Sequence, residues 1–252
     1  MTAAARLTDR LLAHLGSLEP GPAAEAAAGR ELASLEPEEA AELLGALVER
    51  AKDSPGAGHA LTVASRALMF CGAADLPLDH RRRIDAAAVQ LGLTEVAALF
   101  LEEDPSKAID PAATQAPDPL LGGLTLGHKK ALARRADGDS IARLALEGDE
   151  RVVRELLLNP RLTEEQVVRL AARRPARCEA LLEVWRSTRW SVRAGVRRAL
   201  AMNPYTPPEI SLKLLPHLLD ADLKAIRGDN ALHESVRDVA ARLLNAKRDK
   251  PR

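Results

Sequence analysis

Residues 148–160 read GDERVVRELLLNP, and a related stretch occurs twice more in the chain. A shift of 44 residues brings this stretch onto residues 192–204 (VRAGVRRALAMNP), and the same shift again brings it onto residues 236–248 (VRDVAARLLNAKR). A fixed period in the forties, with helix-forming residues inside each copy, is typical of helical repeats that stack side by side. The sequence therefore predicts an α-solenoid. Corresponding positions of the copies hold Val152, Val196 and Ala240, then Arg154, Arg198 and Arg242, then Leu156, Leu200 and Leu244.

The period divides the second half of the chain into three units of about 44 residues, at 119–160, 163–204 and 207–248. Each unit is expected to hold three helices, and the third helices are the most alike. Middle helices are expected at about residues 138–147, 176–186 and 219–227. In the last copy, the apolar positions of the third helix have the spacing of one buried helical face. These positions are Val236, Val239, Ala240, Leu243 and Leu244.

Local signals mark where the first helix of each unit begins. Capping boxes are predicted at Thr163-x-x-Gln166 and at Thr206-x-x-Glu209, where a threonine side chain caps the helix. The first helices themselves are aligned by Leu124, Val168 and Leu212.

Asn-Pro pairs follow two of the third helices, at residues 159–160 and 203–204. Proline does not continue a helix, and asparagine tolerates a left-handed cap. The pairs are therefore interpreted as boundaries between units, without a chemical role.

The charge changes sign along the chain. Residues 1–126 carry 10 Lys and Arg against 19 Asp and Glu (net −9), and residues 127–252 carry 26 against 17 (net +9). Three domains are expected: an acidic helical bundle at 1–103, a Pro/Ala-rich linker at 104–118, and a basic α-helical repeat domain at 119–252. The opposite charges allow an anionic partner for the basic half, docking of the halves, or self-association.

The repeat stretches VRRALAMNPYTPPEISLKLL and RVVRELLLNPRLTEEQVVRLAARRP resemble the HEAT-like and leucine-rich-variant repeats of bacterial proteins. The resemblance covers about residues 119–248 and concerns the repeat type alone. It implies HEAT- or armadillo-like units that present a surface to a macromolecule, and it carries no catalytic residues.

Composition favours helices, because only 2% of the residues are aromatic and long β-branched runs are absent. No apolar run is long enough to span a membrane, and the first twenty residues lack the apolar centre of a signal peptide. Cys71 and Cys178 are far apart in sequence and suit a reduced compartment. The protein is therefore expected to be cytoplasmic, without membrane contact.

The arginines of the third helices are the first candidates for partner binding. If equivalent positions of stacked repeats lie in a row, Arg154, Arg198 and Arg242 grip carboxylates or phosphates along one edge. Arg193 and Arg237 would form a shorter second row. The competing interpretation pairs Arg154 with Glu150, and Arg242 with Asp238, four residues earlier on the same helix. Tyr205, in the turn between two units, is the expected binding hot spot.

The remaining chemistry-bearing residues are given structural roles. Trp185 and Trp190 lie beside arginines and could stack on bases, but rare tryptophans in a helical stack are more often core residues. The six histidines do not have metal-ligand spacing, and no motif of a catalytic site or of a nucleotide-binding loop is present. We therefore expect no enzyme activity, no cofactor and no metal.

Two functions from different classes follow. The first is a non-enzymatic scaffold or adaptor that binds the acidic surface of another protein, for example a signalling or polarity regulator. The second is nucleic-acid binding by the basic half, in the manner of the HEAT-like DNA glycosylases, and steep salt dependence would mark it.

Overall fold

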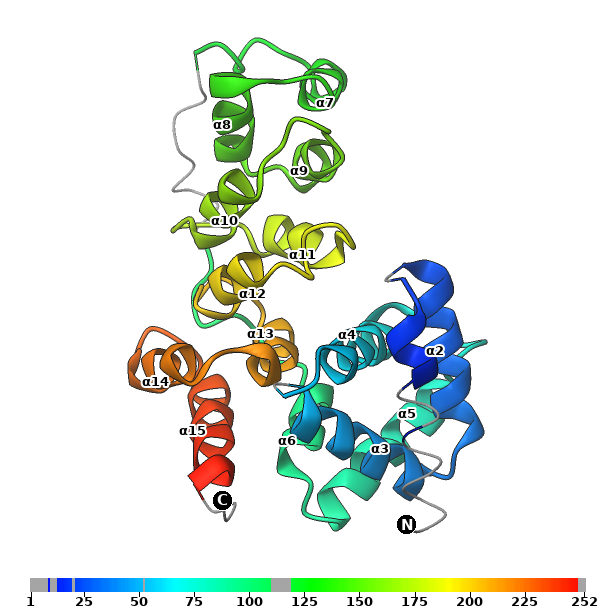
Figure 1. Ribbon diagram of the computed structural model, residues 1–252. Helices are drawn as coiled ribbons and strands as arrows, with labels where there is room; N and C mark the ends of the chain where they lie inside the picture. Colours follow the sequence, from blue (N-terminus) through cyan, green and yellow to red (C-terminus); the bar gives the residue numbers. More distant parts are fainter. Residues whose placement is uncertain (1–8, 10–12, 20, 52, 110–118, 249–252) are drawn as a thin grey trace. The chain divides into compact units, whose positions relative to one another are not determined.

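The computed structural model describes residues 9, 13–19, 21–51, 53–109 and 119–248 of the 252-residue chain. All regular secondary structure in these ranges is helical (Figure 1), which confirms the prediction of an all-α protein. The chain divides into two compact units. Unit 1 consists of Met1–Glu102, Leu212–Gly228 and Ser235–Arg252, and unit 2 of Glu103–Ser211 and Asp229–Glu234. No helix in the described ranges is long and apolar enough to cross a membrane.

Unit 1 begins with helices whose starts are set by proline. Pro22, Pro37 and Pro55 each stand in the first turn of a helix, where the missing N–H of proline costs nothing. Ser54 caps α4, because its Oγ accepts a hydrogen bond from the N–H of Ala57. The helices are α2 (Pro22–Ser34), α3 (Pro37–Arg50), α4 (Pro55–Phe70), α5 (Leu78–Gln90), α6 (Thr94–Ala97), η1 (Ala98–Phe100), η3 (Leu215–His217), α14 (Asp220–Gly228) and most of α15 (Glu234–Arg248).

The core of unit 1 is built on α4, which packs against α2 and α3. A buried ion pair joins α2 to α4, since Arg66 and Glu25 are almost inaccessible to solvent and Arg66 Nε lies 2.7 Å from Glu25 Oε1. Helix α13 (Pro208–Leu214) ends in this unit, and there Lys213 donates a 2.6 Å hydrogen bond to the carbonyl of Leu99. Contacts between residues that are distant in sequence therefore stabilise the unit.

Residues 212–228 and 235–252, expected in the basic repeat domain, thus belong with the N-terminal helices. Because these basic residues lie in unit 1, the two units differ much less in net charge than the two halves of the sequence do. Unit 1 holds 18 Lys and Arg against 19 Asp and Glu, and unit 2 holds 18 against 17. Each unit is close to neutral, so local clusters rather than net charge decide what a surface attracts. Of the expected linker, residues 110–118 lie outside the described residues.

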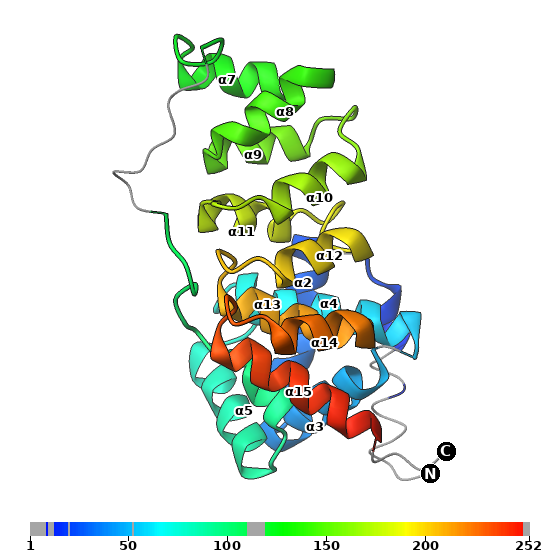
Figure 2. The same cartoon turned by 90° about the vertical axis from the view of Figure 1, so that its left-hand side faces the viewer.

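Unit 2 consists of short helices packed in two rows. Helix α9 contacts α7 and α11, and α10 contacts α8 and α12. Figure 1 shows these two rows side by side, and Figure 2 shows α7 to α12 following one another along one direction. The helices are α7 (Leu126–Ala133), α8 (Gly138–Glu147), α9 (Glu150–Leu157), α10 (Glu164–Ala172), α11 (Cys178–Arg186) and α12 (Ala194–Ala201).

The apolar positions of the repeat are buried as predicted. Val152 on α9, Val196 on α12 and Ala240 on α15 all have 0% relative exposure. However, α9 and α12 stand in different rows, because α9 packs against α7 and α11 whereas α12 packs against α10. Successive copies of the third helix therefore cannot form a single line within unit 2.

The Asn-Pro pairs do more than end helices. Asn159 Nδ2 donates hydrogen bonds to the carbonyls of Ala133 (2.8 Å) and Ala136 (2.9 Å), at the end of α7. Asn203 Nδ2 does the same to the carbonyls of Ala171 (2.7 Å) and Arg173 (2.9 Å), at the end of α10. The left-handed cap expected at these asparagines is wrong, since no described residue other than glycine has a positive φ. The asparagines instead connect the end of α9 to α7 and the end of α12 to α10.

The helix starts that the sequence predicts in this part of the chain are confirmed only in part. The capping box of Thr163 and Gln166 is confirmed. The box expected at Thr206 does not form, because Thr206 Oγ1 is buried without a hydrogen-bond partner. Leu124 precedes α7, which Thr125 caps, so its alignment with Val168 in the middle of α10 is wrong.

Candidate functional site: the charged face of α7, α9 and α11

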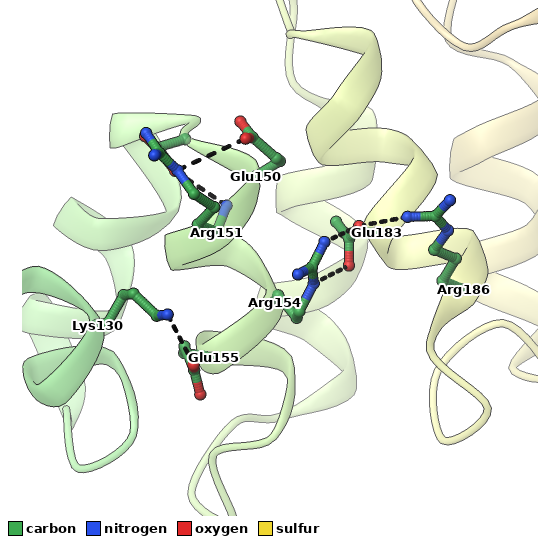
Figure 3. A network of polar contacts seen from close by, with 8 residues as sticks. Lys130, Glu150, Arg151, Arg154, Glu155, Glu183 and Arg186 are labelled. Carbon is green, nitrogen blue, oxygen red and sulfur yellow. Dashed lines mark hydrogen bonds and ion pairs between the residues drawn. The ribbon is translucent and has the colours of Figure 1, made fainter. Parts of the chain in front are cut away.

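Helix α9 places two neighbouring charged residues against two different helices. Glu155 reaches back to α7, and Arg154 reaches forward to α11. Because adjacent residues on a helix point about 100° apart, one short helix engages both of its neighbours in the row. The charged residues of these three helices are here called the charged face. Its central members are Lys130, Arg134, Arg154, Glu155, Glu183 and Arg186, and Figure 3 shows all of these except Arg134 from close by.

The first cluster on this face is centred on Glu155. Arg134, directly after α7, donates from Nε and Nη2 to the two carboxylate oxygens of Glu155, at 2.8 and 2.9 Å. Lys130 Nζ lies 3.5 Å from Glu155 Oε1. Such a bidentate pair fixes the guanidinium plane as well as its position.

The second cluster is centred on Glu183 of α11. Arg154 donates from Nε and Nη2 to Glu183 Oε2 and Oε1, both at 2.8 Å. Arg186, one turn further on α11, donates to the same Oε1 at 3.0 Å. In Figure 3 the two guanidinium groups approach Glu183 from opposite sides. Each buried glutamate of the face therefore collects two cations.

The negatively and positively charged side chains of the two clusters differ in their exposure to solvent. The side chains of Glu155 and Glu183 are only 11% and 6% exposed, whereas those of Arg134 and Arg154 are 61% and 54% exposed. Hydrogen bonds from the arginines hold the pKa values of both carboxyls below their usual range. The carboxylates are therefore charged at neutral pH and lie beneath the cations, so that the face turns positive charge outward.

A third ion pair extends the face at the start of α9. Asp149 caps the helix, accepting from the N–H of Arg151 at 2.9 Å. The side chain of Arg151 returns to both carboxylate oxygens of Asp149, and these bonds lower the pKa of that carboxyl. Arg151 Nε also lies 3.6 Å from Glu150 Oε1. A dashed line in Figure 3 marks this ion pair. Both acids here are partly exposed, and with one arginine against two acids this group adds no positive charge to the face.

The structure separates the arginines that were expected to form one row. Arg154 belongs to the row of α7, α9 and α11, while Arg198, exposed on α12, belongs to the other row. The predicted row is wrong for these two, because the step from α9 to α12 spans three helices and therefore ends in the other row. Arg193 is the exposed N-cap residue of α12. Arg242 is exposed and Arg237 half-buried on α15, in unit 1.

The main partner of Arg154 is not Glu150, as the intrahelical alternative had it. Its hydrogen bonds go to Glu183, 29 residues away, and Glu150 contributes only a weaker electrostatic attraction, while it also lies near Arg151.

Tyr205, the expected hot spot, is half-buried rather than exposed. Its N–H donates to Asn203 Oδ1 at 3.1 Å, so the turn is fixed by the asparagine that also ties the helices together. Beside it, the carbonyl of Pro204 accepts a 3.1 Å hydrogen bond from the N–H of Lys107. Part of this turn is therefore covered by the chain's own segment.

The tryptophans are core residues, as predicted. Trp185 is 0% exposed and Trp190 4% exposed, and Trp190 Nε1 donates to the carbonyl of Leu157 at 2.9 Å. Arg189 lies over the ring of Trp190 at 4.3 Å. Neither ring offers a platform for a base. Among the described residues, no group of three or more His, Cys, Asp or Glu side chains is placed to hold a metal.

Sequence reasoning missed most of the charged face, although one signal was present. Glu155 interrupts the apolar face of α9, and Glu183 stands between Leu182 and Val184. An acid at a position that the helical period places in the core requires a cation from a neighbouring helix. Its partner is too distant in sequence to be identified from the period.

Comparison with family models, with curated proteins and with solved structures gives no match to this chain. The face is therefore interpreted from its own chemistry.

Proposed function

We propose that the protein is a non-enzymatic, cytoplasmic scaffold or adaptor whose repeat units are of the HEAT-like or leucine-rich-variant type. In this proposal the charged face of α7, α9 and α11 binds an acidic surface of another protein. The observation that carries the proposal is the order of charges with depth. Two buried glutamates each hold two cations, and the arginine side chains of both clusters are about half exposed or more.

Pre-positioning makes such arginines effective in recognition. A free arginine loses side-chain entropy when it binds, whereas a guanidinium already held in two hydrogen bonds has lost much of it beforehand. Arg134 and Arg154 use Nε and Nη2 for their glutamates, and within the described part of the chain their Nη1 groups donate no further hydrogen bond. In this proposal these Nη1 groups donate hydrogen bonds to a carboxylate of the partner.

A labelled glutamate homopeptide tests the proposal directly. Fluorescence anisotropy would compare the wild-type protein with an Arg134→Glu/Arg154→Glu variant. The control is Arg169→Glu on α10, where both Arg169 and its partner Glu165 are about three-quarters exposed. We expect the double variant to bind the peptide at least about tenfold more weakly, and the control to bind it nearly as well as the wild type.

A duplex DNA oligonucleotide, measured in parallel, separates the two classes of partner. Tighter binding of DNA than of the peptide, lost in the same double variant and steeply dependent on salt, would replace the proposal by nucleic-acid binding. Equal peptide binding by all three proteins would refute a role of the charged face. Far-UV circular dichroism shows whether the variants remain helical.

A further inference from the structure

We propose that Glu155 and Glu183 are positioning residues, which hold Arg134 and Arg154 in the orientation in which these arginines bind an acidic partner. The inference rests on the proposed function and concerns the same charged face. It reverses the expectation from charge alone, since removing the negative charge of such a glutamate should then weaken the binding of an acidic ligand.

Each of the two glutamates fixes one guanidinium in a defined plane. Arg134 donates to Glu155 from Nε at 2.8 Å and from Nη2 at 2.9 Å. Arg154 donates to Glu183 from the same two nitrogens, both at 2.8 Å. Two parallel hydrogen bonds fix the rotation of a guanidinium as well as its position, whereas a single charge contact leaves the rotation free. The direction of the remaining N–H groups is therefore set before a ligand binds.

The remaining N–H groups of both arginines are available to a ligand. The N–H groups of a guanidinium lie in one plane, and those of Nε and Nη2 used here share one edge of it. Nη1 and the second N–H of Nη2 form another edge, which is not directed at the glutamate and matches the two oxygens of a carboxylate. Within the described ranges the side chains of Arg134 and Arg154 donate no further hydrogen bond, and they are 61% and 54% exposed.

The glutamates act on a ligand through the arginines. Their side chains are only 11% and 6% exposed, so they offer little surface of their own. Hydrogen bonds from Arg134 and Arg154 hold the pKa values of the two carboxyls below their usual range, so both are ionised at neutral pH. Their direct effect on an acidic ligand is repulsion. Any favourable effect therefore comes from the orientation that they give to the arginines.

The favourable and the unfavourable effect of a glutamate differ in their dependence on salt. A long side chain that is not ordered beforehand must be ordered on binding, which weakens the affinity by about two- to tenfold. A ligand bound to the arginine is separated from the glutamate by the guanidinium, and salt at physiological ionic strength screens the repulsion between them. At this ionic strength the positioning of the arginine should therefore outweigh the repulsion.

The test measures the binding of a labelled glutamate homopeptide to the full-length protein by fluorescence anisotropy, at neutral pH and physiological ionic strength. Glu183→Gln keeps the size of the side chain, but its amide nitrogen replaces one oxygen and cannot accept a hydrogen bond from Arg154. The control is Glu179→Gln, which removes an exposed acid one turn earlier on α11. Glu183→Gln is also combined with Arg154→Ala, which removes the group that the glutamate positions.

We expect Glu183→Gln to bind the peptide about threefold more weakly than the wild type, although the variant is more positive by one charge. Glu179→Gln should bind it equally well or more tightly. In the Arg154→Ala background most of the weakening by Glu183→Gln should disappear, because the 3.0 Å hydrogen bond from Arg186 to Glu183 does not by itself fix a plane. A purely structural role of Glu183 would weaken binding by the same factor in both backgrounds.

Two results would overturn the inference and leave the proposed function standing. One is binding by Glu183→Gln that is as tight as that of the wild type or tighter, and the other is equal weakening with and without Arg154. Failure of the wild type to bind the peptide would refute the proposed function itself. Arg134→Ala and Glu155→Gln give the same comparison at the other cluster, and they decide the test if circular dichroism shows that a variant at Arg154 or Glu183 has lost its helices.

Discussion

Arg154 on α9 and Glu183 on α11 form two parallel hydrogen bonds of 2.8 Å, between a half-exposed guanidinium and a buried carboxylate. The pair joins α9 to α11, two neighbouring helices of one row. It therefore stabilises the row as well as shaping its surface. Measurements of unfolding without a ligand report the contribution of the pair to stability, separately from any contribution to binding.

Replacing Arg154 by alanine should destabilise unit 2 by about 1–3 kcal/mol, because Glu183 is left with Arg186 as its one remaining cation. Arg154→Lys should lose less, since the charge stays while the bidentate geometry is lost. Both tryptophans of the chain lie in unit 2, so their fluorescence during urea denaturation reports on this unit. Arg169→Ala, which removes an exposed pair, should cost no more than about 0.5 kcal/mol. Equal effects of the two alanine substitutions would show that the pair of Arg154 and Glu183 adds no more stability than an exposed pair.

The stability of unit 2 should depend on the hydrogen-bond donor of the Asn159 side chain rather than on the size of that side chain. Asn159→Ala leaves the buried carbonyls of Ala133 and Ala136 without these hydrogen bonds, at a cost of about 2–4 kcal/mol. Asn159→Asp should cost more at neutral pH, because a carboxylate would then face two carbonyl oxygens. Tryptophan fluorescence in urea measures both variants. An aspartate variant that is more stable than the alanine variant would contradict the proposed role of the amide.

Helix boundaries could be predicted from the sequence wherever the signals are local. The helix expected at residues 138–147 is α8, and its end is set by Gly148, the left-handed C-cap at φ 71°. Val152, Val196 and Ala240 are all buried, because the spacing of apolar residues determines which side of a helix faces the core. These features depend only on residues within a few turns of each other.

The arrangement of the helices depends on contacts that the repeat period does not contain. The alternation of two rows places α9 and α12 apart, although their sequences correspond. The hydrogen bond from Lys213 to the carbonyl of Leu99 spans 114 residues and joins α13 to the N-terminal helices. Such contacts depend on the packing of whole helices. The repeat period therefore predicted Arg154 as a candidate residue, but it could not predict Glu183, which contacts Arg154 only through the packing of α9 against α11.

Unit 1 provides a test of close helix packing. A Cβ added at Gly58 in α4 would lie 2.8 Å from the carbonyl oxygen of Ala51, which is backbone and cannot move away alone. Gly58→Ala should therefore destabilise unit 1 by about 1–3 kcal/mol. Gly45→Ala in α3 is the matched control, because its Cβ would meet only side chains of Leu93 and Val96, at 3.6–3.7 Å. This control should be neutral or stabilising by up to about 1 kcal/mol, as expected for alanine in a helix. Thermal unfolding followed by circular dichroism compares the two, and equal melting curves would contradict the close approach.

The stability of unit 2 should fall in acid through Glu155 and Glu183. Their pKa values in the folded protein are lowered from the usual 4.5 by hydrogen bonds from Arg134 and Arg154, respectively. The ionised carboxylates therefore bind their partners better than the protonated groups do, and this stabilisation is complete above the unfolded-state pKa. It is lost as the pH falls from about 4.5 through the lower folded-state values.

Tryptophan fluorescence in urea, at neutral pH and at several acidic pH values, would measure this loss. Glu183→Gln should be less stable than the wild type at neutral pH, and the difference should shrink as the pH falls, because the wild-type carboxylate then becomes protonated as well. Glu179→Gln, at an exposed position on the same helix, should follow the wild-type curve. A stability difference between Glu183→Gln and the wild type that stays constant down to the lowest pH would show that the ionised carboxylate is not what the arginines stabilise.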